Sequence, residues 1–168
     1  MNSSLVCILP AFFNKSGHEV DFIDILTIIA HKKKLKIKFI LPKINNLKIV
    51  ADNKKELFAS YDTNFIIKFF YIFCNYFILT KQFKRLKKDD LVYIDGYSFY
   101  FLISLILYLL TNRNRNKLVI WIRYPYDNII KKNIFKFFIY LINIDSSGQL
   151  ITITENFKLA RLLNKDFR

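Results

Sequence analysis

The chain is poor in the residues that interrupt or cross-link a polypeptide, with 3 glycines, 3 prolines and 2 cysteines in 168 residues. So few glycines and prolines exclude a collagen-like protein or a flexible linker. Two cysteines cannot form a disulfide-rich scaffold. Hydrophobic residues make up 53% of the chain and aromatic residues 17%, which excludes intrinsic disorder. The length fits a single domain over residues 1–168 that can bury a real core.

Acidic residues are also scarce, since 13 Asp+Glu face 27 Lys+Arg and the formal net charge is +14. The basic residues are 21 lysines and only 6 arginines, and Ile, Phe, Asn and Tyr are abundant, as expected from an A/T-rich genome. Part of the charge therefore has an explanation that involves no function. The rest favours an anionic membrane surface over nucleic acid, because no RNP-like or GxxG motif accompanies the lysines.

No hydrophobic run is long enough to predict a membrane span. Phe65–Leu79 is interrupted by Lys68 and Asn75, and Tyr97–Leu110 falls short of the ~20 apolar residues that a spanning helix needs. We expect both segments to be buried or membrane-grazing helices.

The start of the chain does not resemble a signal peptide, because no basic segment precedes Leu5–Phe13 and no small-residue cleavage site follows it. Cys7 and Cys74 lie in apolar surroundings, and we expect free, buried thiols. The predicted location is the cytoplasm, with peripheral attachment to the inner face of the membrane as an extension of it.

Short strand-like runs alternate with longer helix-like segments. The expected strands are Leu5–Phe12, Leu35–Leu41, Leu47–Val50, Leu91–Ile94, Leu118–Arg123 and Leu150–Thr154. The expected helices are Glu19–His31, Asn64–Leu86, Ser98–Leu110, Asn128–Asn143 and Asn156–Leu163, and Lys54–Ala59 is also helix-prone. This alternation predicts an α/β fold, a Rossmann-like three-layer α/β/α domain with a mostly parallel sheet. The nearly continuous apolar strands fit a sheet covered on both faces.

Ligands of an open parallel sheet bind outside the carboxyl ends of its strands, so the residues that follow each strand are the candidate binding residues. They are Lys15, Ser16, Gly17 and His18 after the first strand, Asp95, Gly96 and Tyr97 after the fourth, Arg123, Tyr124 and Asp127 after the fifth, and Glu155 after the sixth.

The first of these loops has two interpretations. Gly17 allows a close approach of the backbone to a ligand, the next helix offers free N–H groups to a phosphate, and Lys15 adds charge. Alternatively, Ser16 caps the helix and Glu19 completes a capping box.

Several common sites are absent from the sequence. It has neither GxGxxG nor a P-loop motif, so nucleotide cofactors are not supported. Two distant histidines and two distant cysteines give no metal-ligand spacing, and no Ser-His-Asp arrangement can be argued. We therefore predict no metal and no cofactor, and assign no catalytic residue.

The order of these elements resembles the N-terminal domain of GT-B-fold glycosyltransferases of the family 4-like group. The resemblance covers nearly the whole chain, and the segments that carry it are Ser16–Glu19, Asp89–Gly96, Lys117–Arg123 and Leu150–Thr154. It implies one half of a GT-B fold, on the acceptor side of the cleft. The reaction implied is transfer of a sugar from a nucleotide-sugar donor, a substrate and not a cofactor, to a glycan or lipid-linked acceptor of the cell envelope.

In that family the glycine-rich first loop lies near the donor diphosphate, and Ser16, Gly17 and His18 match it. Relatives often carry a histidine at the end of the fifth strand, where this sequence has Arg123 and Tyr124. The family's acidic donor-binding motif has no counterpart, so we expect the C-terminal donor domain to be absent and the chain to be incomplete alone.

Three explanations stay open: a truncated or split reading frame, an inactive domain, or a membrane-associated subunit that works with a separate donor-binding subunit. The last resembles the acceptor-side subunit of eukaryotic two-subunit glycosyltransferases. A non-catalytic basic binding module is the competing class.

The basic, aromatic segment Lys131–Tyr140 is the candidate membrane contact, through Lys131, Lys132 and Lys136. The alternative is that the aromatic residues of this segment (Phe135, Phe137, Phe138 and Tyr140) belong to the core and the lysines only solvate the helix.

Overall fold

The computed structural model describes residues 3–12, 18–43, 53–57, 64–95, 99–112, 116–122 and 150–154, together with 129–130, 132–134, 136–137 and 140. Its elements, in chain order, are β1 (Ser4–Ile8), α1 (His18–Lys32), β2 (Lys36–Pro42), β3 (Asn53–Leu57), α2 (Phe65–Phe83), β4 (Leu91–Asp95), α3 (Phe99–Thr111), β5 (Lys117–Ile122) and β6 (Leu150–Thr154). The expected strand at Leu47–Val50 and the expected helix at Asn156–Leu163 lie outside the described residues.

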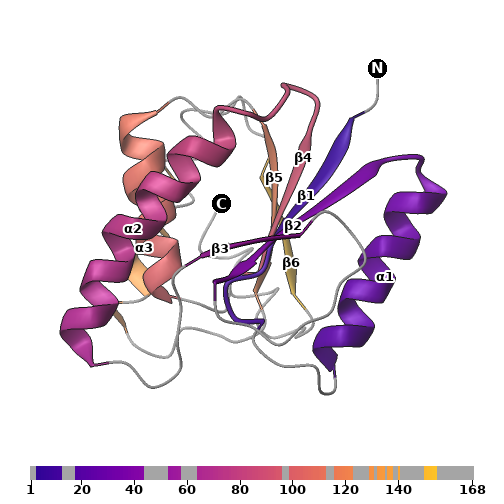
Figure 1. The fold of residues 1–168 in the computed structure, drawn as a ribbon. Coiled ribbons are helices and arrows are strands. Elements are labelled where there is room, and N and C mark those ends of the chain that lie inside the picture. Colours follow the sequence, from indigo (N-terminus) through magenta and orange to yellow (C-terminus); the bar gives the residue numbers. More distant parts are fainter. Residues whose placement is uncertain are drawn as a thin grey trace.

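The six strands form one sheet in the order β3-β2-β1-β4-β5-β6, and every pair is parallel. Helix α1 lies against one face, and α2 and α3 lie against the other (Figure 1). This confirms the predicted α/β/α domain with its parallel sheet.

Each central strand contributes to two separate cores, because successive side chains point to opposite faces of a sheet. Val6 and Ile8 of β1 pack in the core beneath α2 and α3, whereas Leu5 and Cys7 pack in the core beneath α1. The two cores explain why β1 is apolar at consecutive positions.

One predicted helix is wrong. The segment Lys54–Ala59 was expected to be helix-prone, yet Asn53–Leu57 is strand β3 and pairs with β2. Lysine and glutamate favour a helix only weakly, and pairing with a neighbouring strand overrides such a preference. Leu57 is fully buried, and charged residues are common on the last strand of a sheet because they discourage further pairing.

The amino ends of three strands are joined through one buried carboxylate. Asp90 precedes β4 and accepts hydrogen bonds from the backbone N–H groups of Ser4 (2.8 Å) and Lys87 (2.8 Å). The Asn116 amide, just before β5, donates to the carbonyl oxygens of Lys87 (2.6 Å) and Asp90 (3.3 Å). Asp90 is therefore a structural residue that fixes β1, β4 and β5 at the edge opposite their carboxyl ends.

Helix α1 ends in a Schellman motif built on a lysine. The backbone N–H of Leu35 donates to the carbonyl of Ala30 (2.9 Å), and that of Lys34 donates to His31 (3.0 Å). Lys34 has a φ of 54°, in the left-handed region that glycine usually occupies at this position.

We expect Lys34→Gly to raise the free energy of unfolding by about 0.5–1 kcal/mol, because glycine adopts this backbone conformation without a Cβ clash. Chemical denaturation measures the change. Lys33→Gly is the matched control. The Lys33 N–H donates to the Ile29 carbonyl at 3.0 Å, so Lys33 continues the helical hydrogen bonding, and glycine should destabilise the helix end there through its low helix propensity. Equal changes in both variants would contradict the argument.

Candidate functional site

The carboxyl ends of β1, β4 and β5 lie side by side at one edge of the sheet. Ile8 of β1 pairs with Ile94 of β4, and Asp95 of β4 pairs with Trp121 of β5. The chain leaves β1 toward β2 but leaves β4 toward β5 on the other side, so the strand order reverses between β1 and β4. Open α/β sheets bind their ligands at such a switch point.

An aromatic cluster holds the first turns of α1 over this edge. The Phe22 ring stacks on Trp121 with centroids 4.6 Å apart, and lies 5.7 Å from the Tyr93 ring and 5.9 Å from that of Phe12. Phe22 therefore fixes the start of α1 against β4 and β5. The positive end of the helix, which attracts anions, begins at His18 close to the same edge (Figure 1).

Asp95 is the described residue best placed to recognise a polar ligand. The sequence predicted it in the exit turn after Ile94, but β4 continues through Asp95, which is 1% exposed. By the alternation of the strand its side chain shares a face with Tyr93, the face that α1 covers. Asp95 is thus a polar side chain buried at the switch point, the part of an open α/β sheet where ligands bind.

The two buried carboxylates beside β4 differ in what surrounds them. Asp90, at the amino edge, has its oxygens engaged by backbone N–H groups of the fold. Asp95, at the carboxyl edge, pairs across the two strands with Trp121, whose ring stacks on Phe22 of α1. Position alone had suggested Asp95 in the sequence, whereas its burial depends on tertiary packing.

Most other candidate residues fall outside the part of the chain that is described. These are Lys15, Ser16 and Gly17 of the first loop, Gly96 and Tyr97 after β4, Arg123, Tyr124 and Asp127 after β5, and Glu155 after β6. His18 is the first residue of α1, and its side chain is likewise outside the described set. The structure therefore brings together the strand ends from which these loops start.

The cluster of Phe12, Phe22, Tyr93 and Trp121 was not anticipated. One signal pointed to it: Trp121 is the only tryptophan of the chain and stands next to the last residue of a strand. Trp121 is also half-buried, so the indole reports on events at this edge.

The predicted membrane segment is only partly as expected. Lys132 and Lys136 have a helical backbone and half-exposed side chains, and Lys131 is not among the described residues. Phe137 is 46% exposed and Tyr140 is 60% exposed, so the alternative in which they are core residues is wrong for these two. Phe135 and Phe138 are not among the described residues.

The described residues contain neither a cluster suited to a metal ion nor a membrane-spanning helix. Within those residues no group of three His, Cys, Asp or Glu side chains could hold a metal ion. None of the helices searched is long and apolar enough to cross a bilayer.

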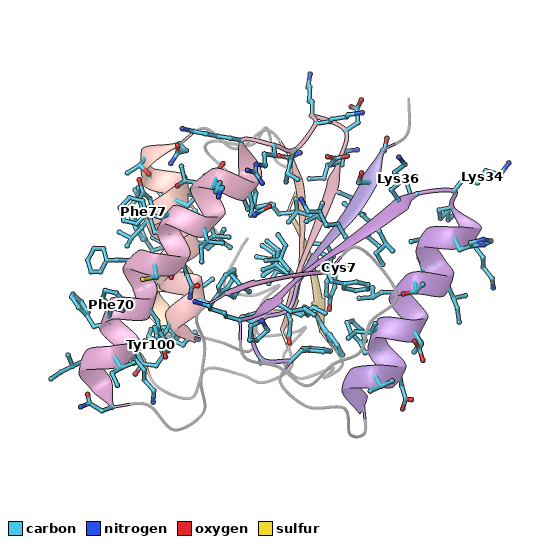
Figure 2. The ribbon with its side chains drawn as sticks, viewed as in Figure 1. Cys7, Lys34, Lys36, Phe70, Phe77 and Tyr100 are labelled. Atoms are coloured by element: carbon cyan, nitrogen blue, oxygen red, sulfur yellow. The ribbon has the colours of Figure 1, made fainter. Side chains whose placement is uncertain are left out.

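Neither cysteine pairs with the other. Both thiols are free. Cys7, which lies in the sheet (Figure 2), is buried as expected, whereas Cys74 is only half-buried. Burial raises the pKa of the Cys7 thiol far above its usual range, since a thiolate could not be solvated there. Cys7 is therefore neutral at physiological pH and is not a nucleophile.

We expect alkylation of the native protein at pH 8 to spare Cys7 and to modify it only after unfolding in denaturant. A Cys74→Ser variant isolates the Cys7 signal, and intact-mass measurement reads it. Modification of native Cys7 at the rate of a free thiol would contradict its assignment as a core residue.

A scan against protein-family models finds none that matches the chain, and a search of curated proteins finds no significant match. The resemblance to glycosyltransferases stays a prediction.

Proposed function

We propose that this chain is the acceptor-side domain of a glycosyltransferase, which transfers a sugar from a nucleotide-sugar donor to a glycan or lipid-linked acceptor. The observation that carries the proposal is the Asp95 side chain, which is buried at the switch point on the sheet face that α1 covers. This is the edge at which the resemblance expects the acceptor-side half to bind its substrate.

The two features of the edge suit the two chemical parts of such a substrate. A carboxylate accepts hydrogen bonds from sugar hydroxyls, and such charge-assisted bonds are stronger than neutral ones. A helix N-terminus favours a phosphate group. In the proposal, Asp95 binds an acceptor hydroxyl while the start of α1, with Ser16, Gly17 and His18, lies near the diphosphate.

The proposal includes a location and a partner. The donor is held by a second domain or by a separate donor-binding subunit, and the chain works in the cytoplasm at the inner face of the membrane, where lipid-linked acceptors are found. Half-exposed Lys132 and Lys136, close in sequence to exposed Phe137 and Tyr140, support attachment to the membrane surface.

Trp121 fluorescence can test the acceptor site without knowledge of the sugar. The probes are water-soluble, short-chain prenyl diphosphates that carry N-acetylglucosamine, glucose or galactose, with UDP as a further probe. We expect at least one sugar-bearing probe to change Trp121 emission saturably, because Trp121 pairs with Asp95 across the two strands. If no probe alters the Trp121 emission or the backbone amide signals in an NMR spectrum, the proposed site is wrong.

The two buried carboxylates of this region make a matched pair of variants. Asp95→Asn should weaken binding of the responsive probe about tenfold or more, since a hydrogen bond to a charged group is worth about 1.5–3 kcal/mol. Asp90→Asn should instead lower the free energy of unfolding by about 1–3 kcal/mol, because backbone N–H groups lose an acceptor, and should leave the affinity unchanged. Unaltered affinity in a folded Asp95→Asn protein would refute the assigned role.

We also expect the 168-residue chain alone to transfer no sugar. Transfer requires a donor that is bound and oriented, and the resemblance places the groups that do this in another domain. A radiolabelled nucleotide-sugar assay with the responsive acceptor tests this point. Transfer by the purified chain would show that it is a complete enzyme.

A further inference from the structure

The outer face of α2 is apolar over most of its length. Six large hydrophobic side chains on this helix are exposed: Ile66, Ile67, Phe69, Phe70, Phe73 and Phe77. Ile66 is 72% exposed and Phe77 67%, and Phe70 and Phe77 project from the helix away from the sheet (Figure 2). Ile66, Phe70, Phe73 and Phe77 follow the three- and four-residue spacing of one helix face, so they form a continuous stripe.

The inner face of the same helix holds polar residues that a surface helix normally turns outward. Asn75 is 3% exposed and Gln82 is 1% exposed, while Leu79 between them is fully buried. Gln82 accepts a hydrogen bond from the Lys38 ammonium group of β2 at 3.4 Å. Because an ordinary surface helix is apolar inside and polar outside, the stripe is not explained by packing within the domain.

Basic residues continue the stripe at its C-terminal end. Lys81, Lys84, Arg85, Lys87 and Lys88 are all exposed. The sequence between Asn64 and Lys88 contains no acidic residue. Lys81 lies in the last turn of α2, where a cation stabilises the helix C-terminus, and the other four follow the end of the helix at Phe83.

We infer that the outer face of α2 docks on an anionic lipid bilayer, with the stripe in the boundary between head groups and acyl chains and the basic end at the lipid phosphates. A helix that lies in this interface has one apolar face and clustered lysines and arginines, and does not span the membrane. The described α2 fits this pattern, because it is not a candidate span and its inner face is packed on the core.

Charge favours a bilayer over a second copy of the chain. If two copies paired through this face in parallel, their basic ends would meet. If they paired antiparallel, each basic end would lie over the positive N-terminal end of the partner helix. Neither arrangement offers the cations an acidic group on α2.

The apolar part of the stripe begins near the edge of the sheet that carries Asp95. Helix α2 starts there and runs back toward the amino edge, where its basic end lies (Figure 1). In its first turns the Lys68 ammonium group lies 5.5 Å from the centroid of the Tyr100 ring, in the helix that follows β4. Docking would therefore bring the candidate acceptor site to the rim of the membrane contact.

Co-sedimentation of the full chain with vesicles tests this inference. We expect binding to phosphatidylcholine vesicles that contain phosphatidylglycerol, at least tenfold weaker binding to pure phosphatidylcholine, and weakening at high salt. Absence of binding, or equal affinity for both vesicles, would overturn the inference.

Matched variants locate the contact. Phe70→Ser with Phe77→Ser should reduce the affinity for anionic vesicles tenfold or more, whereas Ile25→Ser with Ile28→Ser should change it less than twofold. The isoleucines are a fair control because both are more than half exposed on α1, on the opposite face of the sheet. Circular dichroism checks that each variant is folded.

The basic end is tested in the same way. Lys84→Glu with Lys88→Glu should weaken binding by well over tenfold, since each membrane-proximal cation contributes about fivefold. Lys32→Glu with Lys33→Glu at the end of α1 is the charge-matched control. Equal losses in the two pairs would show non-specific attraction, and a dimer in solution that Phe70→Ser with Phe77→Ser dissociates would assign the face to a second copy. Either result would refute bilayer docking.

This inference rests on the proposed membrane association and not on sugar transfer. Asp95→Asn should leave vesicle binding unchanged, so a failure of the acceptor site and a failure of the docking surface are distinguishable.

Discussion

The burial of β1 and β4 on both faces is the constraint that organises this molecule. Both strands lie inside a parallel sheet, with α1 over one face and α2 and α3 over the other. Apolar side chains must then occupy consecutive strand positions, and polar groups are confined to the strand ends. Asp90 supports the fold just before β4, and Asp95 is the last residue of β4, at the edge where open α/β sheets generally bind their ligands.

Local patterns predicted most of this fold because periodicity and capping are local properties. The strand Leu150–Thr154 was predicted with the bounds observed. Helix α1 extends one residue beyond the predicted Glu19–His31 at each end. The predicted helix at Lys54–Ala59 failed because pairing of β3 with β2 is a long-range contact that no local preference encodes. For the candidate site, position identified Asp95, but neither its burial nor the stacking of Phe22 on Trp121 could be read from spacing.

The same limit applies to α2. Its hydrophobic run indicated a helix that is either buried or close to a membrane, and the sequence could not choose between these. The structure shows that Asn75 and Gln82 are buried while Phe70, Phe73 and Phe77 are exposed. Which side of a helix is covered depends on the neighbouring elements, which the sequence of the helix does not specify. The buried Asn75 and Gln82 therefore show, better than the hydrophobic run, which side of α2 faces the sheet.

The place of β1 in the sheet also bears on synthesis of the chain. Its backbone pairs with β2, made soon afterwards, and with β4, which follows some eighty residues later, as the pairing of Leu5 with Leu91 shows. Until β4 has left the ribosome, one edge of the most apolar strand lacks its neighbour, and contacts so distant in sequence form slowly. We therefore expect the nascent chain to depend on chaperones until Asp95 has emerged.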